Sequence, residues 1–305
     1  MLESLEYTRG RRYSEDYGVI AENPFVEDEA RILDSAAYRR LAHKTQVIIS
    51  PSDTFIRTRA SHTSEVVGAA LYIASNLSLN INLCRAIALG HDIGHAPYGH
   101  IGESVLSEIL GRKFRHNIAG VVAAQKIENK GEGLNLSYET LEGILHHSRT
   151  RADLTVDETL PDEYTAVMFA DKIAFALADL NDGIRTGYIN EQRLPEFVHA
   201  LGYSQKKRLF NILGALIRES KEKQIVSFSE GDIAENFYKL RDFLHEAFYY
   251  KIDIDPVKDT LKRAYDFFRE EPKFDGVDPA LALFLLTDSE ANHMAGVFRE
   301  NNKCR

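Results

Sequence analysis

The sequence predicts a nearly all-α fold, because apolar residues recur at helical spacing along most of the chain and alternating strand-like runs hardly appear. One stripe with helical spacing consists of Val66, Val67, Ala70, Leu71, Ala74 and Leu77. Ser61 is placed to cap that helix. A second helix is predicted from about Asp162 to Asp182. Prolines lie between such segments, where they can begin or end helices.

The 305 residues are enough for one large domain with its own core. We predict a helical bundle with an appended C-terminal helical part. The expected parts are an N-terminal helical segment that packs on the core (1–50), the core itself (51–190) and a C-terminal region that completes the pocket and makes oligomer contacts (191–305).

Composition favours a cytoplasmic protein without a membrane segment. The only two cysteines are Cys84 and Cys304, which suits a reducing compartment and argues against cysteine-based metal sites. Apolar runs are interrupted well before the length of a membrane span, and the first residues lack a signal segment. The formal net charge of -9 gives no global attraction for nucleic acid and leaves nucleic-acid binding undecided.

The segment RAIALGHDIGHAPYGHIGE concentrates histidines and acids beside glycine and proline. The apolar run before His91 predicts a buried helix that delivers His91 and Asp92 into the interior, about 100° apart around its axis. Pro97 forbids simple continuation of that helix, so His100 and Glu103 are expected to begin a new one that faces the same cavity. Buried imidazole and carboxylate groups need a partner, and a divalent cation suits both.

The order His62, His91-Asp92 and Asp171 resembles the signature of the HD superfamily of phosphohydrolases. Further blocks are similar to its deoxyguanosine triphosphate triphosphohydrolase branch: ILDSAAYRRLAHKTQVI, TRASHTSEV, LSYETLEGILHHS and FADKIAFALADLNDGI. The likeness is good over roughly 28–185, weaker at 239–250 and slight afterwards. It implies an HD phosphohydrolase core and metal-dependent hydrolysis of deoxynucleoside triphosphates, dGTP among them, to deoxynucleoside and inorganic triphosphate.

The resemblance implies a role for each matching residue. The implied metal ligands are His62, His91, Asp92 and Asp171. Arg59 and Lys172 would neutralise the triphosphate. The implied catalytic residues are His100 and Glu103, which would position the attacking water, His116, which would protonate the leaving group, and His95, which would line the phosphate site or cap a turn.

The resemblance also implies a substrate pocket. Asp171, Phe175 and Asp179 lie four apart on one helix face. Asp179 would take the deoxyribose 3'-hydroxyl, and Phe175 stands where the branch usually has tyrosine. Gln46 and Val47 would contact the sugar. Arg241 and Tyr249 have the spacing of a phosphate-binding arginine and a base-stacking tyrosine.

The implied cofactor is one divalent ion per subunit, with Mn, Mg, Fe, Ni and Zn all open, and a second ion at His116 or His147 is left open as well. The resemblance further implies a homo-oligomer and leaves an activating nucleotide undecided. The basic positions Arg9, Arg11 and Arg12 receive no function.

Two alternatives remain. One is another HD phosphohydrolase, such as a binuclear nucleotide or cyclic-dinucleotide phosphodiesterase, although SRTRADL stands where the GYP segment of that class is expected after His146-His147. The other is a nucleotide-binding regulatory protein with little turnover.

Overall fold

The computed structural model describes residues 8–14, 23–49, 51, 53–148 and 156–303, with side chains described as far as 299. Within these ranges the predicted all-α fold is confirmed, since the extended pairings are isolated bridges between Arg11 and Ser137 and between Thr45 and Thr58. No helix in the same ranges is both long and apolar enough to cross a membrane. Cys304 and most of the SRTRADL segment lie outside the described residues.

The chain divides into two compact units that alternate along the sequence. Unit 1 comprises Met1–Leu33, His62–His91 and Asn135–Ile252, and unit 2 comprises Asp34–Ser61, Asp92–Leu134 and Asp253–Arg305. The boundaries predicted from the sequence at 50 and 190 stay a prediction.

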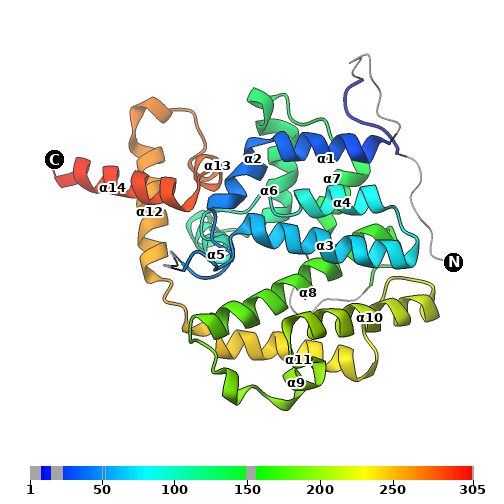
Figure 1. Ribbon diagram of the computed structural model, residues 1–305. Coiled ribbons are helices and arrows are strands. Elements are labelled where there is room, and N and C mark those ends of the chain that lie inside the picture. Colours follow the sequence, from blue (N-terminus) through cyan, green and yellow to red (C-terminus); the bar gives the residue numbers. More distant parts are fainter. Residues whose placement is uncertain (1–7, 15–22, 50, 52, 149–155, 304–305) are drawn as a thin grey trace. The chain divides into compact units, whose positions relative to one another are not determined.

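Unit 1 is organised around one long buried helix, α8 (Asp162–Arg185), which packs against α4, α7, α10 and α11 (Figure 1). This confirms the helix predicted from about Asp162. Most of its side chains are buried. The other helices that lie wholly or mainly in this unit are α1 (Pro24–Asp34), α3 (Arg59–Leu77), α4 (Ile81–Gly90), α7 (Tyr138–His146), η4 (Glu191–Arg193), α9 (Glu196–Leu201), α10 (Gln205–Lys223), α11 (Gly231–Ala247) and η5 (Tyr249–Lys251).

Helix α3 begins two residues earlier than its predicted cap. Thr58 precedes the first helical residue, and its Oγ1 accepts a hydrogen bond from the backbone N–H of Ser61 at 3.4 Å. The Ser61 hydroxyl in turn accepts from the Thr58 N–H at 3.0 Å. The prediction that Ser61 is the cap was wrong: Thr58 is the cap, and Ser61 occupies the third helical position of a reciprocal capping box.

The basic N-terminal stretch has a structural role in unit 1. The Arg9 side chain pairs with Glu139 at 2.8 Å and with Glu142 at 2.5 Å. Arg11 pairs with the fully buried Asp28, whose carboxylate also accepts hydrogen bonds from residues at the start of α7. These contacts fasten residues 9–11 to α1 and α7.

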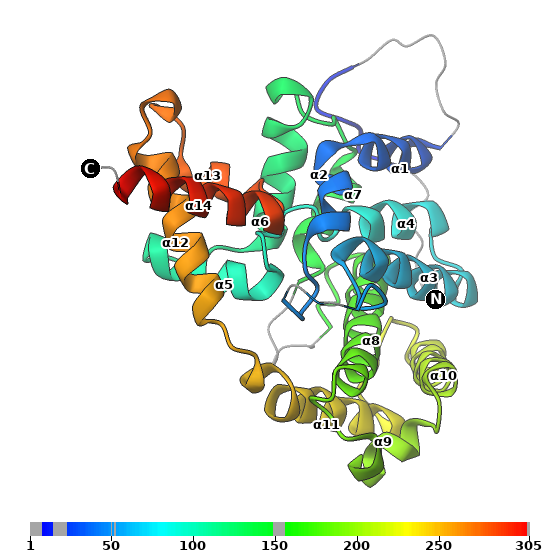
Figure 2. The ribbon, with the colours of Figure 1, turned by 60° about the vertical axis from the view of Figure 1, so that its left-hand side comes forward.

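Unit 2 packs its helices around α12 (Asp255–Glu270), which contacts α5, α13 and α14 (Figure 2). Its apolar core includes Ala96, Leu106, Leu261 and Phe284. The other helices of this unit are α2 (Ala36–Arg40), η1 (Leu41–His43), α5 (Gly99–Leu110), α6 (His116–Val122), the π-helical segment η2 (Ala123–Ile127), η3 (Asn129–Gly131), η6 (Pro272–Phe274), α13 (Pro279–Phe284) and α14 (Asp288–Lys303).

Candidate functional site

In unit 1, three helical segments bring His62, His91 and Asp171 together. His62 lies on α3, His91 directly follows the last residue of α4, and Asp171 lies on α8. His62 Nε2 is 3.1 Å from Asp171 Oδ1, and His91 Nε2 is 3.8 Å from the same oxygen. Both imidazoles are fully buried. We call these three residues the metal triad.

Two members of the metal triad, His91 and Asp171, present donor atoms in the state that metal ligands need. His91 Nδ1 is 2.7 Å from the Ala88 carbonyl, so it donates its proton there and leaves a lone pair on Nε2. Burial alone raises the pKa of Asp171, but the charge of Lys172, 2.8 Å away, and the hydrogen bond from His62 outweigh it and hold the pKa well below its usual range. Asp171 is therefore a carboxylate.

The spacing of these atoms approaches that of ligands on one divalent ion. Donor atoms that are each about 2.1 Å from an ion lie roughly 3 to 3.5 Å apart. The 3.1 Å between His62 and Asp171 lies in this range, and the 3.8 Å between His91 and Asp171 is slightly longer. His62 Nδ1 is buried and has no hydrogen-bond partner among the described residues, whereas the corresponding nitrogen of His91 donates to the Ala88 carbonyl. Imidazole nitrogen with carboxylate oxygen is a ligand set for Mn, Fe, Ni or Zn.

His147 lies beside the metal triad within unit 1. Its ring is edge-on to that of His91, with centroids 5.1 Å apart, and its side chain is buried. Its Nδ1 is 2.7 Å from the Ile144 carbonyl, the same contact that His91 makes with Ala88. The sequence singled out His147 through the LSYETLEGILHHS block and as a candidate for a second ion, which stays a prediction.

The same α8 face, one and two turns after Asp171, carries residues implied for substrate. The Phe175 ring is 5.9 Å from His62 and 6.1 Å from Tyr249. The Tyr249 hydroxyl donates to Asp179 at 2.5 Å. Burial lowers the pKa of Arg241, and the charge of Asp171 is among those that oppose this shift. Unit 1 thus gathers the predicted residues Phe175, Asp179, Arg241 and Tyr249 near the metal triad.

In unit 2, Asp92 lies between the Arg59 guanidinium and the His95 ring. Its Oδ2 is 2.9 Å from Arg59 Nη1, and its Oδ1 is 3.2 Å from His95 Nε2. Arg59 is almost completely buried and also donates to the backbone carbonyls of Thr45 and Gln46. The peptide bond between His91 and Asp92 joins this group to the metal triad along the chain. Its place as the fourth metal ligand stays a prediction.

Gln46 has a buried side chain whose amide group makes no hydrogen bond among the described residues. It is 2 % exposed, and neither its amide oxygen nor its amide nitrogen has a hydrogen-bond partner among the described residues. Leaving a buried amide unpaired is costly, and a polar ligand group would offset that cost. Val47, next to it, is half-buried.

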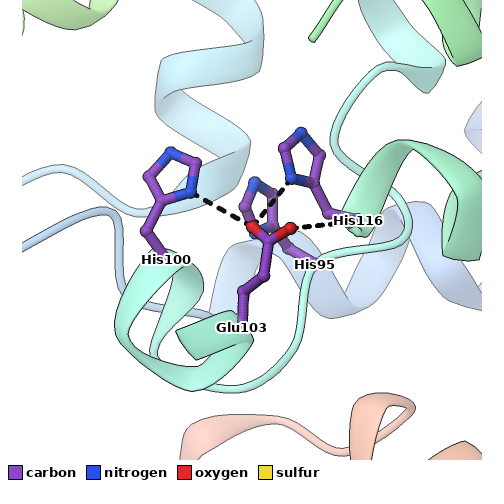
Figure 3. Close-up of side chains that lie close together, drawn as sticks. All are labelled: His95, His100, Glu103 and His116. Carbon is purple, nitrogen blue, oxygen red and sulfur yellow. Dashed lines mark hydrogen bonds and ion pairs between the residues drawn. The ribbon is translucent and has the colours of Figure 1, made fainter. Parts of the chain in front are cut away.

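Three predicted catalytic histidines of unit 2 lie around the carboxylate of a fourth predicted catalytic residue, Glu103 (Figure 3). Glu103 Oε2 is 3.0 Å from His116 Nδ1 and 3.4 Å from His100 Nδ1, and Glu103 Oε1 accepts from the His116 backbone N–H. The His95 ring stacks on that of His116, with centroids 3.9 Å apart. We call these four residues the histidine cluster.

The histidine cluster has defined charge states. Burial raises the pKa of Glu103, but hydrogen bonds from His100 and His116 outweigh this and place its pKa far below the usual range. Burial lowers the pKa of His95, and the charges of Arg59 and His116 act in the same direction. An ionised Glu103 therefore faces a neutral His95 and holds Nδ1 of His100 and His116 toward itself, which turns their Nε2 atoms away.

Two glycines permit the turn that carries the histidine cluster. Gly99 has φ +58°, and a Cβ there would lie 2.4 Å from Arg59 Nη2. A Cβ at Gly94 would lie 2.1 Å from the His116 carbonyl oxygen, so α6 can approach only a glycine. As predicted, a new helix begins after Pro97, with His100 and Glu103 in its first turns. His91 and Asp92, however, fall just beyond α4 and not inside it.

Sequence reasoning missed Lys44 and Asp288, which hold the histidine-bearing turn. The Lys44 ammonium donates to the carbonyls of His95 and Phe284, and the Asp288 carboxylate accepts from the N–H groups of Thr45 and Tyr98. Lys44 lies inside the ILDSAAYRRLAHKTQVI block, but its apolar surroundings are not visible in the sequence. Asp288 lies where the family likeness is slight.

Comparison with known proteins places these residues in context. Residues 59–176 match the model of the HD domain. Three relatives are each called a deoxyguanosinetriphosphate triphosphohydrolase-like protein. That of Caldanaerobacter subterraneus subsp. tengcongensis is 39% identical over 276 residues, which cover 89% of this chain and 78% of the relative. That of Clostridium tetani is 37% identical over 274 residues (86% and 78%), and that of Clostridium perfringens (strain SM101) is 42% identical over 231 residues (74% and 67%).

Proposed function

The chain belongs to the HD-domain, deoxyguanosinetriphosphate triphosphohydrolase-like family of phosphohydrolases, and from this premise we propose that it hydrolyses deoxynucleoside triphosphates to deoxynucleoside and inorganic triphosphate. The observation that carries the proposal is the metal triad, in which two buried imidazoles converge on one ionised carboxylate. The coarser assignment, a metal-dependent phosphohydrolase, needs only this triad and the family.

His62, His91 and Asp171 would hold the ion, with Asp92 as the fourth ligand next to His91 in the chain. When bound, the ion supplies Lewis-acid charge for the phosphoryl oxygens. Lys172 and Arg59 add positive charge for the remaining oxygens of the triphosphate. In this structure Lys172 pairs with Asp171, and Arg59 pairs with Asp92. Each cation must therefore give up part of its ion pair to bind phosphate.

The histidine cluster would supply proton transfer. Glu103 holds His100 so that its Nε2 can accept the proton of a water that attacks the α-phosphorus. The new P–O bond forms as the bond to the 5'-oxygen breaks, and His116 protonates the leaving 5'-oxygen. His95, kept neutral by burial, would contact the transferring group as a hydrogen-bonding partner without adding charge.

Asp179 and Gln46 would select the sugar. A carboxylate accepts a hydrogen bond from a 3'-hydroxyl, and the Tyr249 hydroxyl already fixes the orientation of Asp179. The unpaired amide of Gln46 supports a polar contact with the sugar. Phe175 can pack against a sugar or base but cannot donate the hydrogen bond of the tyrosine that the family usually has there.

A panel of the four dNTPs and four rNTPs, each with Mn, Mg, Fe, Ni or Zn, tests the proposal. Release of inorganic triphosphate from dNTPs is expected. In water enriched in oxygen-18, the label should appear in triphosphate and the deoxynucleoside should be unlabelled. Exclusive formation of monophosphate and pyrophosphate would reject this chemistry, and tight dNTP binding with no product would favour the regulatory protein.

One observation favours the binuclear alternative as a second candidate. The donor atoms of His95, His100, Glu103 and His116 all lie within 4.8 Å of one another, a set that also suits a divalent ion. Metal analysis of the purified protein separates the two cases: one ion per chain supports the triphosphohydrolase, and two ions with hydrolysis of a cyclic dinucleotide support the alternative.

A further inference from the structure

The turn that carries His95 is fastened by side chains from distant parts of unit 2. Lys44 is 2 % exposed, and its Nζ donates to the His95 carbonyl at 2.5 Å and to the Phe284 carbonyl at 2.9 Å. Phe284 ends α13. One ammonium therefore joins the backbone beside a proposed catalytic histidine to the C-terminal helices.

A carboxylate makes the complementary link. Asp288, the first residue of α14, accepts from the Thr45 N–H at 2.8 Å through Oδ2 and from the Tyr98 N–H at 2.8 Å through Oδ1. The Tyr98 hydroxyl donates to the Asp288 carbonyl at 3.3 Å. Residues 44–45 and 95–98 are thus linked twice to the C-terminal helices. Lys44 makes the link to the end of α13, and Asp288 makes the link to the start of α14.

The fastened turn has a backbone that needs such support. Tyr98 has φ +61°, in the left-handed region that non-glycine residues disfavour, and Gly99 follows with φ +58°. Such conformations persist where the surroundings determine them. The ring of His95 stacks on His116, so a relaxed turn would move one proposed catalytic ring against another.

We propose that Lys44 and Asp288 are positioning residues for the His95–His100 turn, so that α13 and α14 serve catalysis without touching substrate. The inference rests on the proposed function for its kinetic consequence and on geometry for its structural one. Burying a lysine against two carbonyl oxygens is expensive, because neither acceptor carries the full charge of a carboxylate. A mere filler of this space would be apolar.

The test compares Asp288→Asn and Lys44→Met with Glu290→Gln as a matched control. Asparagine keeps the shape of Asp288 but retains one oxygen, so one of the two backbone N–H groups loses its acceptor. Glu290 lies two residues away and contacts Thr287 alone among its described hydrogen bonds. We expect kcat to fall roughly 10- to 100-fold in both test variants, with KM within about 3-fold and metal content unchanged, because small misplacements of catalytic groups have effects of this size. Glu290→Gln should stay within about 2-fold.

A second readout does not depend on activity. Long-range proton–nitrogen NMR spectra of the histidine rings report tautomer and stacking, and Asp288→Asn should shift the resonances of His95 and His116 while Glu290→Gln leaves them in place. Folded test variants with unchanged kcat and unchanged His95 resonances would overturn the proposal. If the wild-type protein releases no triphosphate, the proposed function fails, and the spectra alone decide whether Lys44 and Asp288 position the turn. If Lys44→Met does not fold, Asp288→Asn, the milder change, is measured against wild type at low temperature and decides the test.

Discussion

The metal triad and the histidine cluster hold their side chains in different ways. His62 and Asp171 stand on long regular helices, and His91 follows one directly, so their directions are set by helix packing within unit 1. The histidine cluster stands on a turn and the first residues of two shorter helices in unit 2. Regular helices hold a site more precisely than a loop does, so the geometry of a turn depends more on its individual hydrogen bonds. The predictions below test whether the two groups also differ in function.

The largest effect is expected from His91→Ala. The metal triad would lose a nitrogen ligand, and with it the ion and the transition-state stabilisation that the ion supplies, so activity should fall by at least about 10³-fold. Metal analysis of the purified variant should show loss of the ion with an unchanged circular dichroism spectrum. His199→Ala, a half-buried histidine of α9 elsewhere in unit 1, is the control and should keep both ion and activity. Full metal content in His91→Ala would refute the ligand assignment.

A smaller loss, with the ion retained, is expected from Glu103→Gln. The amide no longer holds two imidazoles by charge, and loss of positioned proton transfer costs about 10²- to 10³-fold in kcat. Glu108→Gln is the matched control, because Glu108 lies on the same helix but pairs with Lys258 and Lys262 at the surface. If Glu103→Gln also lost the ion, the histidine cluster would be a metal site, as in the binuclear alternative.

The sequence predicted those features of the two groups that depend on residues close together in the chain, and it missed those that depend on distant residues. The 171, 175, 179 spacing and the apolar run before His91 are local, and both predict which side chains share a helix face or enter the interior. The contacts of Lys44 with Phe284 and of Asp288 with Thr45 join residues more than two hundred positions apart, and no periodicity encodes them. The same limit hid the alternation of the two units along the chain. The family likeness supplied the roles of His100, Glu103 and His116, which spacing alone left open.

Two features of single turns, the cap of α3 and the backbone conformation of Tyr98, were not predicted correctly, and each has a local cause. Thr58 caps α3 in place of Ser61 because the two residues form a reciprocal pair, and either one matches a cap by residue type. The left-handed conformation of Tyr98 was not predicted, because a tyrosine in a turn carries no such signal.

An intermediate effect is expected at the sugar end of α8. Tyr249→Phe removes the hydroxyl that donates to Asp179, so the carboxylate loses its fixed orientation and we expect KM for a dNTP to rise about 10-fold with kcat nearly unchanged. Discrimination against the matching rNTP should fall as well. Tyr250→Phe is the control, since Tyr250 is 76% exposed. A pure kcat effect in Tyr249→Phe would place Tyr249 with the reacting groups and not with the sugar.

The smallest effect concerns folding stability and singles out Lys44 in unit 2. Burial, followed by the charge of Arg40, lowers the pKa of Lys44 to about 7, from 10.5 in the unfolded chain, while Asp288 and Glu290 oppose the shift and Arg59 adds to it. Between these two values the unfolded state binds a proton that the folded state does not, so the free energy of unfolding rises with pH, by at most about 1.4 kcal/mol per pH unit. Below pH 7 both states are protonated and the full cost of the buried charge remains.

Lys44→Met removes this contribution, so the difference in unfolding free energy between wild type and variant should change steadily from pH 7.5 to 9.5 in urea titrations. Taking the difference cancels the shared titration of Cys84 and Tyr98, whose pKa values are raised by burial. A difference that does not vary with pH would mean that Lys44 keeps its proton throughout, and that its link to the His95 carbonyl is that of a permanent cation.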